Sequence, residues 1–540
     1  MNQPILRLFG LVVAMFALLV AFTSRWTVFE AASLRDNPLN ARAVLQQQRI
    51  QRGAILAANG SVLARSVRVA SSGSSEAIYE RTYPTHEEFA NAIGYSYIDL
   101  GRTGLESFRN DVLSGQRETG LQSILNQLQG TKPRGDEVIT TLQPGAQQVA
   151  NAALAGHEGA VLALDPRTGA VLVMASSPSY DPNALRSARA LRRLTSSAGG
   201  KPLVNRTTQF GYAPGSTFKV VTATAAIDSG QFTPESTVNG RNGVPVSGVP
   251  LQNDNNASYG SITLTEALAK SVNTVWAQVA EKLGKPTMAR YMDRFGFNHK
   301  PRLDYPAEEM SSSGEYEGAR LISPLSPAVD VGRLGIGQDK LEVVPLQMAE
   351  VAAAVANHGR LMAPHLTDRV VDPDGRTVQR ISPRVQSVAM KPSTADSVTK
   401  MMEAVVNEGT GTAAQIPGVP VAGKTGTAET QIGTAINNVW FIAFAPAPAP
   451  RVAIAVTLRG VPGFGGAFAA PVAKQVMDSL LHGCAGHDHR RPLPRALAAR
   501  LRRHGRRVPG RGRTARQTGS AEAAAPPLRR GPGVRGALPP

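Results

Sequence analysis

The sequence predicts an α/β protein in which an antiparallel sheet flanked by helices follows a smaller mixed α+β module and one N-terminal transmembrane helix. At ~100–200 residues per domain, 540 residues suffice for two or three folded units. Apolar runs of strand length occur in two separate groups, within residues 160–174 and 421–458, and helical patterns lie between them. A single longer apolar run, residues 5–22, precedes both groups.

The N-terminal run predicts an uncleaved membrane anchor, residues 1–26. Its length matches the ~30 Å of hydrocarbon in a bilayer, with Arg7 at the cytoplasmic end and Trp26 at the opposite interface. A cleaved signal peptide is the alternative, but its best small-x-small site is only residues 21–23. No second run of this length follows, so we expect a single-pass protein of the cell membrane whose remaining chain is extracytoplasmic.

Residues 27–140 indicate a mixed module that positions another domain, and we call it the pedestal. Residues 52–55 begin a strand, Asn59-Gly60 form a turn before a further strand, and residues 101–106 are turn-rich. A Gln-rich helix is expected at 121–128. No concentration of titratable groups is expected in the pedestal.

We expect residues 141–485 to form the main domain. A strand at 138–140 and a helix at 144–154 precede a hairpin whose turn is formed by residues 165–169. We expect this hairpin and a late group of strands to share one antiparallel sheet. The predicted strands of that sheet are 160–164, 170–174, 421–429, 438–444 and 452–458.

The net charge of +18 is concentrated at the C-terminal end. Residues 486–540 hold fourteen arginines against Asp488 and Glu522, so +12 of the total lies in this tail. The tail contains no lysine and no aromatic residue to stack on bases, so nucleic acid is not an expected partner. Its composition predicts disorder. The arginine content fits either a functional basic tail or a shift of the reading frame in the gene. The single cysteine, Cys484, excludes a disulfide framework and a multi-cysteine metal site, and we expect no metal and no cofactor.

Ser216 and Lys219 are the first candidates for covalent chemistry. They lie three residues apart at the start of an apolar helix, 220–227, which ends at Ser229-Gly230, so they share one face. A serine hydroxyl needs a base, and a lysine can act as one only when burial or a nearby cation lowers its pKa. A helix start inside the core supplies burial and free N–H groups that favour negative charge.

A second Ser-x-x-Lys pattern, Ser397 to Lys400, is expected to be a decoy. Ser393 and Asp396 predict a capping box ahead of it. The pair then falls on the solvated side of the helix, opposite a buried stripe of Val398, Met401, Met402 and Val405.

Ser271-Val272-Asn273 is the only Ser-x-Asn pattern in the chain. It interrupts a helical stretch that starts with a capping box, Thr263 and Glu266, and ends at Gly284. A polar break between two helices either presents a hydroxyl and an amide to a site or caps the second helix.

Lys424-Thr425-Gly426-Thr427 lies in an expected strand, where a glycine indicates that another backbone comes close. An extended peptide substrate laid along the strand edge would be such a backbone. The hydroxyls of Thr425 and Thr427 would hold a carboxylate, and Lys424 would supply a cation that also lowers the pKa of Lys219.

Together and in this order, Ser216-x-x-Lys219, Ser271-x-Asn273 and Lys424-Thr425-Gly426 resemble the signature of the penicillin-recognising serine acyltransferases. The chain also resembles class B penicillin-binding proteins, in particular the actinobacterial penicillin-binding protein A group, over about residues 135–480. Further matching segments are 177–183, 205–206, 335–338, 345–347 and 438–441.

The resemblance implies the penicillin-recognising fold, with an all-helical subdomain beside the sheet and a dimerisation-like pedestal. Arg52-Gly53-x-Ile55 and Gly101-x-x-Gly104-x-Glu106 match the family as well. Where the family usually continues with Asp-Arg-Asn-Gly, this chain has Ala57-Ala58-Asn59-Gly60, which removes a charged pair near the neighbouring domain.

The resemblance also implies a mechanism. Ser216 would attack the carbonyl of the penultimate D-Ala of a peptidoglycan stem peptide, with Lys219 as general base. The leaving D-Ala would be protonated through Ser271 with Lys424 behind it. Asn273 would orient Lys219 and the substrate amide.

The resemblance further implies that the N–H groups of Ser216 and Thr427 form an oxyanion hole, which would bind the carbonyl oxygen of the reacting bond. An amine of a second stem would resolve the acyl-enzyme into a cross-link, and β-lactam antibiotics would be trapped at Ser216. The expected protein is therefore a membrane-anchored peptidoglycan D,D-transpeptidase.

Two alternatives stay open. A D,D-carboxypeptidase or β-lactamase-like hydrolase would send water to the acyl-enzyme, although the anchor and pedestal favour the transpeptidase. A catalytically silent structural partner of a cell-wall synthesis complex is disfavoured by the intact motifs. The pedestal is too short and too poor in paired carboxylates for glycan polymerisation, so the resemblance implies a separate polytopic membrane glycosyltransferase as partner.

Overall fold

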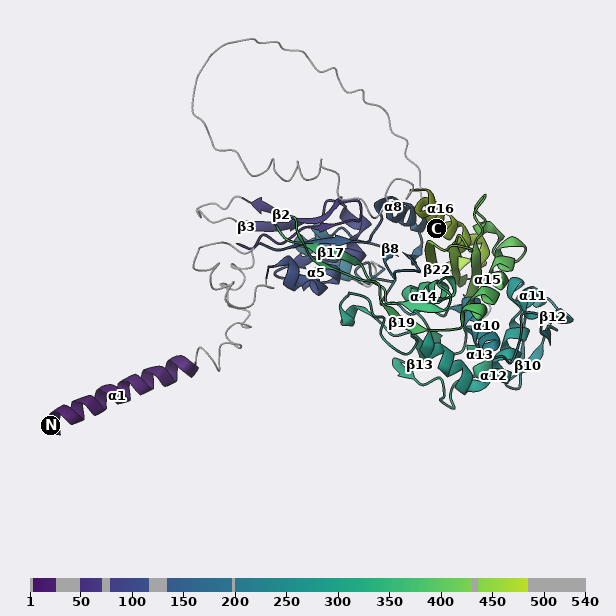
Figure 1. The fold of residues 1–540 in the computed structure, drawn as a ribbon, viewed down its shortest axis with the longest axis horizontal. Helices are drawn as coiled ribbons and strands as arrows, with labels where there is room; N and C mark the ends of the chain where they lie inside the picture. The colour runs from purple at the N-terminus through teal and green to yellow at the C-terminus, as the bar shows by residue number, and fades with distance from the viewer. Residues whose placement is uncertain are drawn as a thin grey trace, which may run out of the picture. The chain divides into compact units, whose positions relative to one another are not determined.

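The computed structural model describes residues 3–25, 49–69, 78–115, 134–196, 200–429 and 436–483. Trp26, Cys484, the helix expected at 121–128 and the tail 486–540 lie outside these residues. The N-terminal apolar run forms α1 (Gln3–Ser24), purple in Figure 1, with a mean hydropathy of 2.6 over its most apolar window. It is long and apolar enough to cross a membrane, and within the described residues no other helix meets that test.

The predicted central sheet is confirmed, and it places the first hairpin beside the late strands. The strand order is β20-β21-β22-β7-β8, with every neighbouring pair antiparallel. The strands are β7 (Glu158–Leu164), β8 (Val171–Ser177), β20 (Ala422–Glu429), β21 (Ile436–Ala445) and β22 (Val452–Pro462). β20 forms one edge of the sheet and contacts the turn that carries Ser216.

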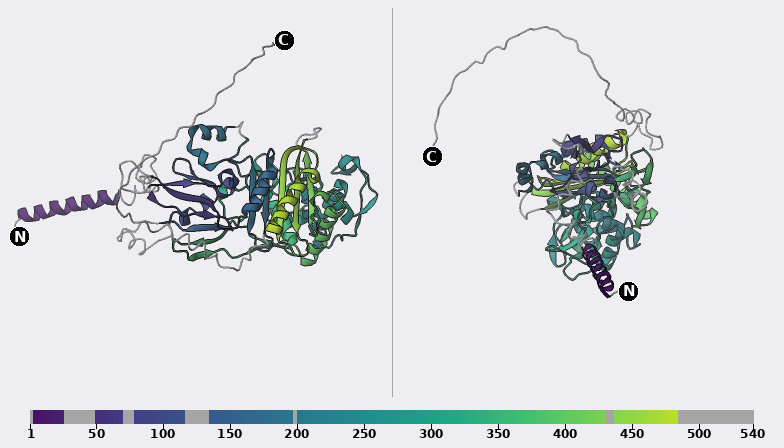
Figure 2. Two further views of the ribbon diagram at one scale, coloured as in Figure 1. Left: turned by 90° about the horizontal axis from the view of Figure 1, so that it is seen from above. Right: turned by 90° about the vertical axis from the view of Figure 1, so that its left-hand side faces the viewer.

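Helices cover both faces of this sheet. Alternate residues of β7 join opposite cores, with Val161 and Ala163 on one side and Leu162 and Leu164 on the other. The first core contains α8 (Pro144–Leu154) and α16 (Gly465–Gly483), which pack together (Figure 1). In the left view of Figure 2, α16 is the yellow helix against the strands. The second core contains α14 (Pro345–Ala356), whose side chains are all buried, and α15 (Pro392–Asn407).

β20 itself carries the third predicted motif, and the segment between β8 and β20 carries the first two on and beside helices. These are the 3-10 helix η5 (Gly215–Phe218), α10 (Lys219–Asp228), α11 (Leu264–Ala269) and α12 (Asn273–Arg294). The buried helix expected at 220–227 is present, as is the capping box of Thr263 and Glu266. α12 is interrupted at Gly284, where φ is 73°, and continues beyond it.

The segment between β8 and β20 also contains shorter elements. They are η3 (Pro182–Arg186), α9 (Ala188–Thr195), β9 (Thr237–Asn239), β10 (Val244–Val246), β11 (Val249–Leu251), η6 (Asp254–Asn256), β12 (Ser261–Thr263), η7 (Ala307–Glu309), β13 (Gly314–Glu317), β14 (Arg320–Ile322), α13 (Val331–Leu334), β15 (Leu341–Glu342), β16 (Arg360–Met362), β19 (Val385–Val388) and η8 (Thr412–Ala414).

The pedestal is built on a second sheet, in the order β18-β17-β6-β1-β2-β3. Its strands are β1 (Ile55–Leu56), β2 (Val62–Val69), β3 (Ile78–Thr82), β6 (Glu137–Thr140), β17 (Thr367–Val371) and β18 (Thr377–Arg380). β17 pairs antiparallel with β6, so a hairpin from deep within the main-domain sequence extends the pedestal sheet. Smaller pedestal elements are η2 (His86–Glu88), α4 (Ala90–Ile93), β4 (Ser96–Tyr97), β5 (Gly101–Arg102), α5 (Gly104–Phe108) and α6 (Asn110–Leu113).

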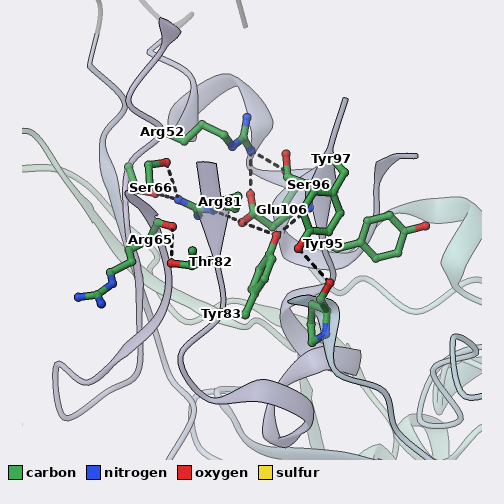
Figure 3. A network of polar contacts seen from close by, with 12 residues as sticks. Arg52, Arg65, Ser66, Arg81, Thr82, Tyr83, Tyr95, Ser96, Tyr97 and Glu106 are labelled. Carbon is green, nitrogen blue, oxygen red and sulfur yellow. Dashed lines mark hydrogen bonds and ion pairs between the residues drawn. The ribbon is translucent and has the colours of Figure 1, made fainter. Parts of the chain in front are cut away.

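The expectation that the pedestal concentrates no titratable groups is wrong. Figure 3 shows Glu106 of α5 between Arg52 and Arg81. Glu106 is fully buried, its Oε2 lies 2.8 Å from Nη2 of Arg52, and its Oε1 accepts a hydrogen bond from the Tyr83 hydroxyl at 3.3 Å. Burial raises the pKa of Glu106, but the two arginines more than offset it and hold the pKa below its usual value. Because Arg52, Glu106 and the pair Arg81 and Tyr83 lie far apart in the chain, no local composition revealed the cluster.

Ala57 and Ala58, which replace the charged pair usual in the family, leave the local backbone intact. Ala57 is fully buried, and the N–H of Ala58 donates to the Leu142 carbonyl at 3.0 Å. A backbone hydrogen bond therefore joins the pedestal to the start of the main domain where the family's charged pair is missing.

The capping box predicted for α15 is wrong. The helix begins at Pro392 with Lys391 as its N-cap, because proline has the φ that a first helical turn requires. Lys400 is nevertheless exposed, Ser397 donates to the Ser393 carbonyl at 3.0 Å, and the predicted apolar stripe is buried.

Candidate active site

Ser216 lies on η5, the single 3-10 turn that leads into α10. Side chains at i and i+3 of a 3-10 helix eclipse one another, so Ser216 and Lys219 project from one face as predicted. Ser216 is half-buried, whereas Lys219 is fully buried. The serine is thus open to a substrate and the lysine is shielded from water.

Three oxygens surround Nζ of Lys219. It donates to the Ser271 carbonyl at 2.8 Å, to Ser271 Oγ at 3.3 Å and to Asn273 Oδ1 at 2.6 Å. Three acceptors match the three N–H groups of the charged Lys219 side chain. When Lys219 loses one proton, its nitrogen gains a lone pair that can receive the proton of Ser216. Burial lowers the pKa of Lys219 to about 7, while the Asp254 carboxylate acts in the opposite direction. A large fraction of Lys219 is therefore uncharged near neutral pH, as a general base requires.

Ser271 and Asn273 lie at the predicted break between α11 and α12. The left-handed backbone of Ser271, with φ of 58°, lets both its carbonyl and its hydroxyl face the Lys219 amine. The Asn273 amide donates to the Gln252 carbonyl at 3.1 Å and to Asp254 Oδ1 at 3.3 Å. The Asn273 side chain thus links Lys219 to the segment 252–254, which no sequence pattern indicated.

Lys424 of β20 contacts Ser271, the serine that Lys219 also contacts. It is fully buried, and its Nζ donates to Ser271 Oγ and to the Thr425 carbonyl, both at 2.9 Å. Burial and then the charge of Lys219 lower the pKa of Lys424. We expected the Lys424 charge to lower the pKa of Lys219, but burial lowers the pKa of Lys219, and the charge effect runs from Lys219 to Lys424. The Ser271 hydroxyl therefore bridges two buried lysines.

The two threonines after Lys424 differ in accessibility. Thr425 is buried, and its hydroxyl pairs with that of Thr410 at 2.6 Å. Thr427 is half-buried, and its hydroxyl accepts from the Gly465 N–H at 3.3 Å. Of the two hydroxyls expected to hold a carboxylate, that of Thr427 is the more accessible. No pattern in the sequence pointed to Thr410.

The close backbone predicted from the glycine in β20 belongs to the chain itself. A Cβ on Gly426 would lie 2.7 Å from the Pro214 carbonyl oxygen, and a Cβ on Gly215 would lie 2.4 Å from that of Thr427. Only glycines allow η5 to lie this close to β20. The N–H groups of Ser216 and Thr427 consequently come from adjacent backbone segments.

Acylation of Ser216 by benzylpenicillin should depend on pH through Lys219. Its pKa is lowered from 10.5 to about 7, so Lys219 is protonated and inactive as a base below that pH and uncharged above it. The second-order rate constant should rise about tenfold between about pH 6 and 8. Stopped-flow mixing with a fluorescent penicillin measures it, and a rate that stays flat over this range would contradict the assignment of Lys219 as base.

A half-exposed serine above a buried lysine, a second serine between two buried lysines, and a strand edge beside them are the features of a penicillin-recognising serine acyltransferase. Family comparison agrees with this class. The Penicillin binding protein transpeptidase domain matches residues 159–478, and the Penicillin binding protein A dimerisation domain matches residues 52–138. The chain belongs to the penicillin-binding protein transpeptidase family.

Relatives match over most of their length. Peptidoglycan D,D-transpeptidase PbpA of Mycobacterium tuberculosis is 34% identical over 512 residues, which cover 89% of this chain and 100% of that protein. Peptidoglycan D,D-transpeptidase MrdA of Escherichia coli is 30% identical over 436 residues, 74% of this chain and 68% of that protein. Penicillin-binding protein A from M. tuberculosis, solved as a ceftriaxone acyl-enzyme complex, is 33% identical with a TM-score of 0.72, covering 81% of this chain and 100% of that one.

Proposed function

We propose that this protein is a peptidoglycan D,D-transpeptidase that cross-links stem peptides through an acyl-enzyme on Ser216 and is acylated there by β-lactams. The observation that carries this proposal is the buried hydrogen-bonded chain Lys219–Ser271–Lys424 beside the turn that bears Ser216. Two buried amines joined by one hydroxyl can pass a proton without solvent.

In the proposed acylation, Ser216 Oγ attacks the carbonyl carbon of the penultimate D-Ala as its proton moves to uncharged Lys219. The N–H groups of Ser216 and Thr427 stabilise the negative charge on the carbonyl oxygen. The C–N bond then breaks, and the terminal D-Ala leaves with a proton delivered through Ser271, which Lys424 contacts. A stem peptide would lie along the open edge of β20, where backbone hydrogen bonds can hold an extended chain.

The acceptor distinguishes a transpeptidase from a hydrolase of the same fold. Support for the transpeptidase comes from the pedestal sheet, which the main-domain hairpin β17–β18 completes, and from relatives named D,D-transpeptidases that match along both modules. In this proposal α1 holds the protein in the cell membrane as a single-pass anchor with the catalytic domain extracytoplasmic. A separate polytopic membrane glycosyltransferase would supply the glycan strands.

The proposal predicts cross-linked product from the full-length protein. It should be incubated in detergent with glycan strands polymerised by a separate glycosyltransferase, and the digested product analysed by liquid chromatography and mass spectrometry. We expect stem-peptide dimers together with free D-Ala. Free D-Ala with no dimers would identify a carboxypeptidase, and an unchanged substrate would identify a silent protein.

A further inference from the structure

We propose that Asp254 binds the cationic amine of the acceptor stem peptide and thereby favours an amine over water at the acyl-enzyme. This inference rests on the proposed transpeptidase function and adds the residue that recognises the second substrate.

Asp254 is an exposed carboxylate one side chain away from the general base. Its Oδ1 accepts from the Asn273 amide at 3.3 Å, and the Oδ1 of that same amide accepts from Lys219 at 2.6 Å. Its charge acts on both buried lysines and raises the pKa of each. Across the described residues no ion pair joins Asp254 to a cationic side chain, so its second oxygen can take a ligand.

The loop that carries Asp254 is held in an unusual conformation. Asn255 and Asn256 both have left-handed backbones, with φ of 55° and 54°. Two successive non-glycine residues in this region are costly and persist only when the surroundings fix them. The buried Asn253 does so, because its side chain accepts from the Thr274 N–H at 3.0 Å and donates to the Ala257 carbonyl at 2.9 Å. The carboxylate is therefore presented by a rigid loop.

The charge of Asp254 opposes the first half of the reaction. The charged groups that face Lys219 are Asp254 from η6 and Lys424 from β20, and the carboxylate favours the protonated lysine, which cannot act as base. We therefore assign Asp254 to a different step of the reaction. The acceptor amine is a cation at neutral pH and needs a negative partner near the acyl carbon.

Donor binding would release that negative partner. When a carbonyl oxygen of the donor stem peptide accepts from the Asn273 N–H, it replaces Asp254 in that hydrogen bond, so both carboxylate oxygens become free to bind the incoming ammonium. In the transfer step the amine nitrogen bonds to the acyl carbon as the ester bond to Ser216 Oγ breaks. Of the two protons that the ammonium gives up, one restores the Ser216 hydroxyl through Lys219 and the other passes to solvent beside Asp254.

Asp254→Asn in the full-length protein tests the assignment. With a D-alanyl thioester as donor, we compare a lysyl dipeptide as cationic acceptor with hydroxylamine, which is uncharged near neutral pH. The variant should raise the apparent KM for the lysyl dipeptide about tenfold or more, whereas the KM for hydroxylamine, which offers no charge to the carboxylate, should change much less. Acylation by benzylpenicillin at pH 6 should become faster, because the charge that favours protonated Lys219 is gone. Asp254→Glu should restore part of the acceptor affinity.

Asp374→Asn, in the exposed turn between β17 and β18, is the matched control and should behave as wild type. An unchanged KM for the lysyl dipeptide in Asp254→Asn would overturn the inference. Equal losses with both acceptors and with benzylpenicillin would also overturn it, because they indicate a structural role for the loop. If the wild-type protein transfers to no amine at all, the proposed function fails and this inference fails with it. If the wild-type protein transfers but Asp254→Asn has an unchanged KM, only this inference fails.

Discussion

Lys219→Met should slow acylation by benzylpenicillin about 10²–10⁴-fold. Methionine has nearly the same length as lysine and can fill the same buried space, but it cannot take the proton of Ser216. The fold should tolerate the change, because removing a buried amine also removes the cost of burying it. Lys424 should then titrate closer to an ordinary lysine, since the Lys219 charge no longer lowers its pKa.

Lys400→Met provides the matched control for this prediction. It removes the lysine of the second Ser-x-x-Lys pattern, which is exposed on α15. Its acylation rate should equal that of the wild type. A Lys219→Met protein that melts normally and still reacts at more than about a tenth of the wild-type rate would show that another group acts as base.

Ser216→Ala should abolish covalent labelling by fluorescent penicillin altogether. Ser271 should not replace it, because Ser271 is buried whereas Ser216 is half-buried and open to the antibiotic. The loss of one half-buried oxygen should change the unfolding temperature little, so labelling and stability can be separated. Gel fluorescence and thermal unfolding measure the two.

The control for this variant is Ser397→Ala, which alters the serine of the decoy pattern. Its hydroxyl only donates to the Ser393 carbonyl within α15. It should label like the wild type. Labelling that survives in Ser216→Ala, or disappears in Ser397→Ala, would place the nucleophile elsewhere.

The sheet and the motifs could be predicted because each has a local cause. Strands buried on both faces give continuous apolar runs, as in β21 and β22, and the turn at 165–169 separates two such runs. The spacing of Ser216 and Lys219 follows from one helical turn. The order of the three motifs along the chain then indicated the family.

What could not be predicted depends on contacts between distant segments. The pairing of β17 with β6 and the cluster around Glu106 join residues that no local pattern connects. Thr410 and Asp254 were missed for the same reason, since each is joined to the site by a hydrogen bond to a residue distant in the chain, Thr425 or Asn273. The glycine in β20 indicated a close backbone correctly, but the sequence could not tell the protein's own turn from a substrate.

The site of acylation tests the central claim, that Ser216 is the nucleophile of this site. Full-length protein is treated with benzylpenicillin near neutral pH, digested, and mapped by tandem mass spectrometry. The account predicts a single adduct on Ser216 that persists long after free penicillin is removed. An adduct on Ser271 or Ser397, or no adduct on a folded protein, would contradict it.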